Sequence, residues 1–90
     1  MDTYLATNKL SKTVLRMTKA YSSFFYFTLE ANENICFYST LPFEKGQSFR
    51  DIAVYCTPEL APQFQKILSH CMAAQDIDIL EHSIINDSED

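Results

Sequence analysis

Apolar residues recur with two different spacings along this 90-residue chain, and the order of these spacings limits the folds open to it. Residues 60–72 place apolar side chains three and four positions apart, which is typical of a helix that packs on one side. Residues 13–18, 35–41, 49–56 and 76–85 are short segments with the alternation or the β-branched and aromatic content of strands. The pattern therefore predicts four strands and at least one helix.

The aromatic segment from Tyr21 to Ala31 is compatible with two structures. Four of its apolar residues repeat at helical spacing, but the run Phe-Phe-Tyr-Phe-Thr also favours a strand. We predict a helix, because Ser22 or Ser23 can cap its first turn. In the alternative, residues 24–30 pair with residues 35–41 as a β-hairpin.

The second helix begins near two prolines. Thr57 and Pro58 resemble a helix start, since a hydroxyl can cap and a proline fits the first helical position. Pro62 lacks the N–H that would bond back one turn. We therefore expect the regular helix to begin near Ala61.

The resulting order is strand, helix, strand, strand, helix, strand. It predicts an α+β, ferredoxin-like βαββαβ fold, with a four-stranded antiparallel sheet and two helices on one face. Residues 12–85 are expected to form this single domain, after a flexible N-terminal arm (1–11) and before an acidic disordered tail (86–90).

Composition excludes several classes of function. The formal net charge of −5 disfavours nucleic-acid binding, which depends on clustered Lys and Arg. The single glycine, Gly46, leaves no glycine-rich phosphate loop. We find no signal peptide and no run of about 20 apolar residues, so we expect a cytoplasmic protein with no membrane partner. The odd set of three cysteines also fits reduced thiols rather than a disulfide framework.

Histidine and cysteine residues supply the candidates for a metal or a nucleophile. His70, Cys71, Cys56 and His82 are the only collection of zinc-type ligands, but neighbours on a helix diverge by about 100°, so His70 and Cys71 cannot easily share an ion. No motif supplies an oxyanion hole for a Cys-His pair. We therefore predict no metal site, no cofactor and no catalytic residue, and expect that the chain is not an enzyme.

Several segments support a resemblance to a known family. They are Leu15-Arg16-Met17, Tyr21 to Ala31, Ser39-Thr40 and Asp51-Ile52-Ala53-Val54. Together they resemble a family of small bacterial domains of unknown function with a ferredoxin-like fold, which is distantly similar to ACT-type regulatory domains. The ACT likeness implies an amino-acid ligand near the turn into the first helix.

By that likeness the ligand-binding residues would be Lys19, Tyr21, Ser22 and Ser23. ACT-type regulators usually carry a glycine in this turn, and the stretch from Thr18 to Ser22 has none. A small-ligand sensor of this kind is our alternative prediction.

Our first prediction is a non-catalytic module that associates with itself as a homodimer or with another protein. Two helices would cover one face of the sheet, yet apolar and aromatic residues fall on both faces of the strands. Val14, Tyr38 and Tyr55 are expected on the uncovered face, and an exposed apolar patch of this kind marks an interface.

Overall fold

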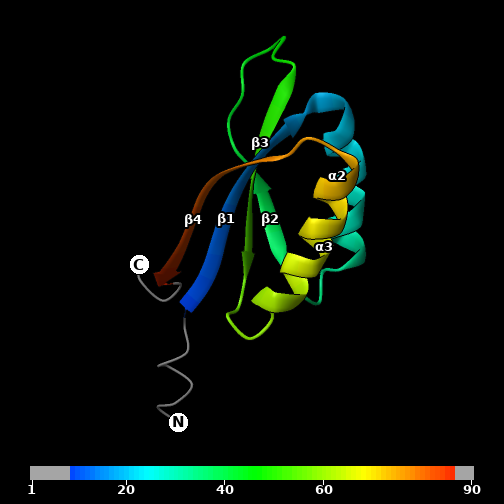
Figure 1. Cartoon of the computed structure of the whole chain (residues 1–90). Coiled ribbons are helices and arrows are strands. Elements are labelled where there is room, and N and C mark those ends of the chain that lie inside the picture. The colour runs from blue at the N-terminus through cyan, green and yellow to red at the C-terminus, as the bar shows by residue number, and fades with distance from the viewer. Residues whose placement is uncertain (1–8, 87–90) are drawn as a thin grey trace.

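The computed structural model describes residues 9–86, which form one four-stranded antiparallel sheet and two helices (Figure 1). The elements are β1 (Lys9–Thr18), α2 (Lys19–Ala31), β2 (Phe37–Thr40), β3 (Phe49–Cys56), α3 (Ala61–Ala74) and β4 (Asp78–Asn86).

The strands follow the order β2-β3-β1-β4, so the first and third strands are central. Leu15 of β1 lies opposite Ile52 of β3 on one side and opposite Ile79 of β4 on the other. Both helices lie on the same side of the sheet (Figure 1). The predicted α+β, ferredoxin-like arrangement is confirmed. We call α2 and α3 the helix layer, and the opposite side of the sheet the free face.

The aromatic segment is helical. Thr18 caps α2, because its Oγ1 accepts a hydrogen bond of 3.1 Å from the backbone N–H of Tyr21. At the other end the backbone N–H of Asn32 donates to the carbonyl of Leu29. Phe25 and Leu29 point into the core. The alternative hairpin of residues 24–30 with 35–41 is therefore wrong.

The second helix begins at Ala61, as predicted. Pro62 lies in its first turn, where a missing N–H leaves no intrahelical bond unmade. Thr57 does not cap the helix through its hydroxyl; its backbone carbonyl instead accepts from the N–H groups of Leu60 and Ala61.

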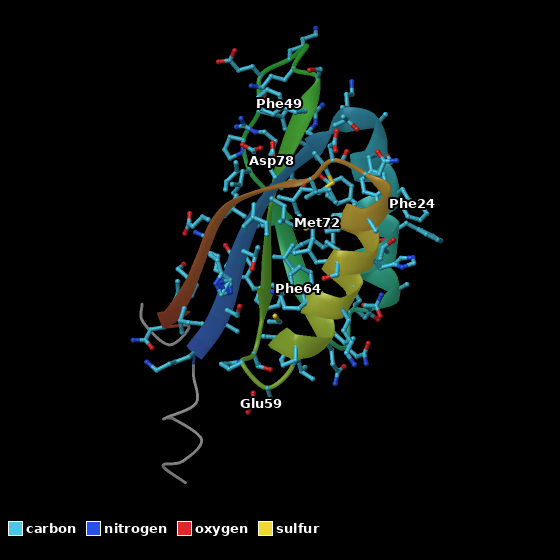
Figure 2. All side chains as sticks on the ribbon, in the orientation of Figure 1. Phe24, Phe49, Glu59, Phe64, Met72 and Asp78 are labelled. Carbon is cyan, nitrogen blue, oxygen red and sulfur yellow. The ribbon has the colours of Figure 1, made fainter. Side chains whose placement is uncertain are left out.

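The core lies between the sheet and the helix layer, where Figure 2 shows Phe64 of α3 directed toward the strands. Apolar side chains from one face of β1 and β3 meet one side of each helix there, as the strand and helix periodicities require. The buried cluster consists of Leu15, Met17, Phe25, Leu29, Cys36, Ile52, Val54, Cys56, Phe64, Leu68, Cys71 and Ile77.

Three boundaries differ from the prediction, and one of them is that of Asn86, which was assigned to the acidic tail but belongs to β4 and lies opposite Lys9. Residues 9–11, assigned to a flexible arm, belong to β1, because Ser11 lies opposite both Cys56 of β3 and Ile84 of β4. The other eight residues of the predicted arm, and residues 87–90 of the predicted tail, lie outside the described residues. β2 is shorter than predicted because Ile35 and Cys36 donate their backbone N–H groups to Asn32 in the turn after α2.

One residue of β4 interrupts its pairing with β1. Val14 lies opposite Glu81 and Leu15 lies opposite Ile79, so Leu80 has no partner on β1. This is a β-bulge on an edge strand, where such irregularities are common.

Candidate functional site

The three residues predicted to line the free face do not all lie on it. Tyr38 pairs with Val54, which faces the helix layer, and its ring stacks on Tyr26 of α2 with the centroids 5.1 Å apart. Its hydroxyl donates to Glu30 Oε2 at 2.8 Å. Tyr38 and Tyr55 cannot share a face, because they belong to strand positions of opposite parity in paired β2 and β3. The placement of Tyr38 on the free face was therefore wrong.

Val14 and Tyr55 do lie on the free face, next to Ala53, which is opposite Val14 and two positions from Tyr55 on β3. Val14 is only 5% exposed, and Tyr55 stacks on Phe37 at a centroid distance of 5.1 Å. The predicted free-face residues therefore expose little of Val14, while Phe37, which lies opposite Tyr55, is 55% exposed.

Two ion pairs lie on the free face. Arg16 binds Asp51 through two hydrogen bonds of 2.8 and 2.9 Å and lies 4.1 Å from the centre of the Phe49 ring. Lys12 Nζ lies 3.7 Å from Glu81 Oε2. A partner that docked on this face would have to displace water from these ion pairs, which costs free energy.

The helix layer, in contrast to the free face, carries few charged side chains. Its two fully described helices together hold three charged residues, Lys19, Glu30 and Lys66. Two large aromatic side chains of α2 are exposed, Phe24 at 58% and Phe27 at 72%. Figure 2 shows Phe24 on the outer side of α2, away from the strands. Few charges and exposed aromatics are the composition of a protein interface core.

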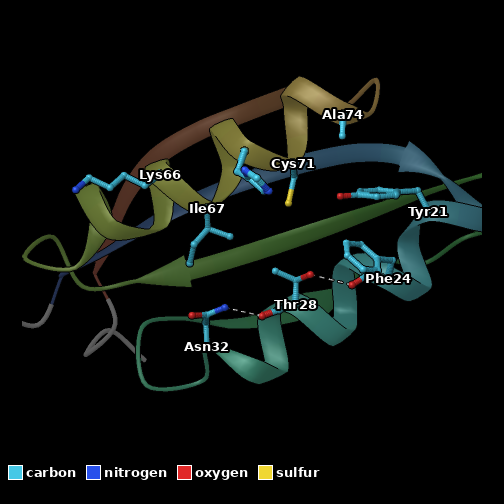
Figure 3. Close-up of a pocket in the computed structure, with 9 residues that line it drawn as sticks. Tyr21, Phe24, Thr28, Asn32, Lys66, Ile67, Cys71 and Ala74 are labelled. Carbon is cyan, nitrogen blue, oxygen red and sulfur yellow. Dashed lines mark hydrogen bonds between the residues drawn. The ribbon is translucent and has the colours of Figure 1, made fainter.

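A groove of about 530 Å³ separates the two helices on this side (Figure 3). We call it the inter-helix groove. Most of its wall is apolar, and no carboxylate among the described residues lines it. Its lining is Tyr21, Phe24, Thr28 and Asn32 from α2 and Lys66, Ile67, His70, Cys71 and Ala74 from α3.

The hydroxyl of Tyr21 points toward Cys71 at one end of the groove (Figure 3). Burial, with a smaller effect of the neighbouring Cys71, raises the pKa of Tyr21 to about 12. Tyr21 therefore stays uncharged at neutral pH. On the α2 side, Thr28 donates to the carbonyl of Phe24 and the Asn32 amide donates to the carbonyl of Thr28. These bonds leave the middle of the groove apolar.

Of the four residues predicted to bind a ligand, Tyr21 alone lines the groove. The side chain of Ser22 is buried and donates to the carbonyl of Lys19 at 2.7 Å. Lys19 and Ser23 are exposed outside the groove lining. The four side chains do not converge on one site.

The cysteine and histidine candidates do not gather into one cluster, although Cys56 and His82 both lie beside Ser11. Cys36, Cys56 and Cys71 are buried thiols. Burial raises the pKa of Cys36 to about 11, and burial also raises the pKa of Cys56. His82 Nε2 lies 3.3 Å from Ser11 Oγ on the opposite side of α3 from His70. Within residues 9–86, no group of three or more His, Cys, Asp or Glu residues is placed to hold a metal ion.

Sequence reasoning did not name Phe27 or Lys66 as candidate site residues, and it considered His70 only as a metal ligand or nucleophile partner. A signal was present for Phe27: it follows the buried Phe25 by two positions, which is about 200° of helical rotation. It must therefore point away from the core if Phe25 points inward. The low charge of both helices was a second signal, since exposed helix faces usually carry charged side chains.

Comparisons with protein families, with curated proteins and with solved structures gave no significant match for this chain. No helix within residues 9–86 has the length and apolar character needed to cross a membrane.

Proposed function

We propose that this chain is a non-catalytic self-association module whose helix layer packs against the helix layer of a second copy. The supporting observation is the pair of exposed aromatic rings, Phe24 and Phe27, on a surface with few charges. Burying a Phe side chain fully is worth about 1.5–3 kcal/mol, so two rings on each copy are a substantial driving force. A two-fold interface uses the same patch twice and so doubles that gain.

The distribution of charge favours the helix layer over the other surfaces as a contact between identical chains. The chain has a net charge of −5, so two copies repel each other overall. The helix layer holds two basic residues and one acidic residue, and thus little of that negative charge. Pairing two β4 edges would instead bring Asp78 and Glu81 of both copies together.

Sedimentation velocity over a range of concentrations tests the proposal. We expect wild-type protein to dimerise with increasing concentration and the Phe27→Ser variant to remain monomeric. Phe37→Ser is the matched control, because Phe37 is a phenylalanine of comparable exposure, 55%, on the free face. This control should dimerise like the wild type.

Two results would overturn the proposal. One is a wild-type chain that stays monomeric at millimolar concentration. The other is a dimer that Phe37→Ser dissociates and Phe27→Ser leaves intact, which would place the contact on the free face. Circular dichroism of both variants establishes that each is folded.

A further inference from the structure

The inter-helix groove is complete within one copy of the chain. Tyr21, Phe24, Ile67 and Ala74 expose apolar surface to its interior. Packed helices normally interlock side chains at an axial separation of about 8–10 Å, which leaves no such space. Its volume of about 530 Å³ lies within the range of small-molecule sites, which are apolar with a few placed polar groups.

The two ends of the groove carry different polar groups. Lys66 lies at one end, and Tyr21, an uncharged hydroxyl, lies at the other (Figure 3). Within residues 9–86, no carboxylate oxygen lies within 4.0 Å of Lys66 Nζ in an ion pair. His70 lines the same side, and its imidazole can donate an N–H. One end of the groove can therefore receive an anion.

We propose that the inter-helix groove binds a medium-chain aliphatic monocarboxylate, with the chain along Ile67 and Phe24 and the carboxylate toward Lys66 and His70. The apolar wall provides the affinity through burial of the methylene groups, at about 0.8 kcal/mol for each. The positive charge of Lys66 favours a carboxylate head group. An amine head group would need an acidic partner, and no acidic side chain of the described residues lines the groove. This site goes beyond the proposed self-association and does not depend on it.

Titration of the ¹⁵N-labelled protein followed by NMR tests the site, with octanoate, 1-octanol and octylammonium as probes. We expect saturable octanoate binding with shifts at Thr28, Ile67 and Cys71. Octanol and octylammonium should bind at least fivefold more weakly. Lys66→Gln should weaken octanoate binding about fivefold, the upper range for an exposed ion pair, and Lys45→Gln, in the β2–β3 loop, should leave it unchanged.

A second variant tests the apolar part of the site. Ala74→Phe introduces a ring into the groove and should abolish binding of octanoate, while Ala73→Phe, one residue earlier and outside the groove lining, should not. Equal affinity for octanoate and octanol, unchanged affinity in Lys66→Gln, or shifts on the free face would each overturn the proposal. Repeating the titration in Phe27→Ser separates the two proposals, because ligand binding is expected to persist in the monomer.

Discussion

Arg16 and Asp51 form a bidentate ion pair across the two central strands, with Nε 2.8 Å from Oδ1 and Nη2 2.9 Å from Oδ2. The two residues are direct neighbours in the register of β1 and β3. Arg16 also lies over the ring of Phe49 in the same strand as Asp51. This arrangement fixes a planar guanidinium on the free face, and it makes that face a poor apolar interface.

The ion pair predicts a pH dependence of stability. The hydrogen bonds from Arg16, followed by its charge, hold the pKa of Asp51 below its usual value despite the opposing effect of burial. A lowered carboxyl pKa adds stability above the pKa of the unfolded state, and this is lost as the pH falls through the folded value. Asp51→Asn should therefore be less stable than the wild type at pH 7, with the difference shrinking toward pH 3. Urea unfolding at pH 7, 5 and 3 measures it.

The matched control is Glu59→Gln, an exposed carboxylate in the turn before α3. Its unfolding free energy should follow the wild type at all three pH values. A difference between wild type and Asp51→Asn that stays constant with pH would contradict the prediction.

The side-chain cap of α2 predicts that stability depends on the hydroxyl of Thr18. Thr18→Ala removes the acceptor for the Tyr21 N–H and should lower the free energy of unfolding by about 1 kcal/mol. Thr18→Ser keeps the acceptor and should restore most of it. Thr57→Ala, before a helix with no side-chain cap bond among the described residues, should change stability less than Thr18→Ala. Equal losses at both threonines in urea denaturation would rule out the capping role.

The helical assignment of residues 19–31 predicts opposite results for two phenylalanines two positions apart. Phe25 is fully buried, so Phe25→Ala should cost about 3–5 kcal/mol. Phe27→Ala should change the unfolding free energy of the monomer by less than about 0.5 kcal/mol, as for other surface substitutions. Thermal denaturation at low protein concentration checks both, and similar losses at the two positions would argue against this packing.

We predict that the buried cysteine thiols react slowly with alkylating reagents. Because burial, and then the charge of nearby Cys56, raises the pKa of Cys36, little thiolate forms at neutral pH. We expect iodoacetamide at pH 7.5 to label Cys36 far more slowly in the folded protein than in 8 M urea. Peptide mass spectrometry after timed quenching gives the rate at each cysteine. Rapid labelling of Cys36 in the folded state would contradict this prediction and would support a nucleophilic role for a cysteine.

The periodicity of the sequence was sufficient for most of the fold. β3 spans Phe49–Cys56 as predicted, and α3 begins at Ala61 because the constraint on Pro62 is local. The N-terminal boundary of β1 was missed because residues 9–11 are mostly polar. Their strand conformation comes from pairing with β3 and β4 on both sides, which a local pattern does not contain.

The candidate site was harder to predict because it depends on relations between elements. The inter-helix groove results from the separation of α2 and α3, and no spacing within one helix encodes that distance. The face of Tyr38 depends on its register with Val54 of β3. The outward direction of Phe27, in contrast, was already determined once Phe25 was assigned to the core.

The unpaired Leu80 in β4 determines on which face of the sheet its neighbours Ile79 and Glu81 lie. With it in place, Ile79 lies on the side of Leu15 while Glu81 lies on the side of Val14. Because side chains alternate along a strand, deleting this residue would invert one of the two flanking segments. Either Glu81 would move to the helix side of the sheet, or the half-exposed Ile79 would move to the free face. This position should therefore tolerate substitution better than a change in chain length.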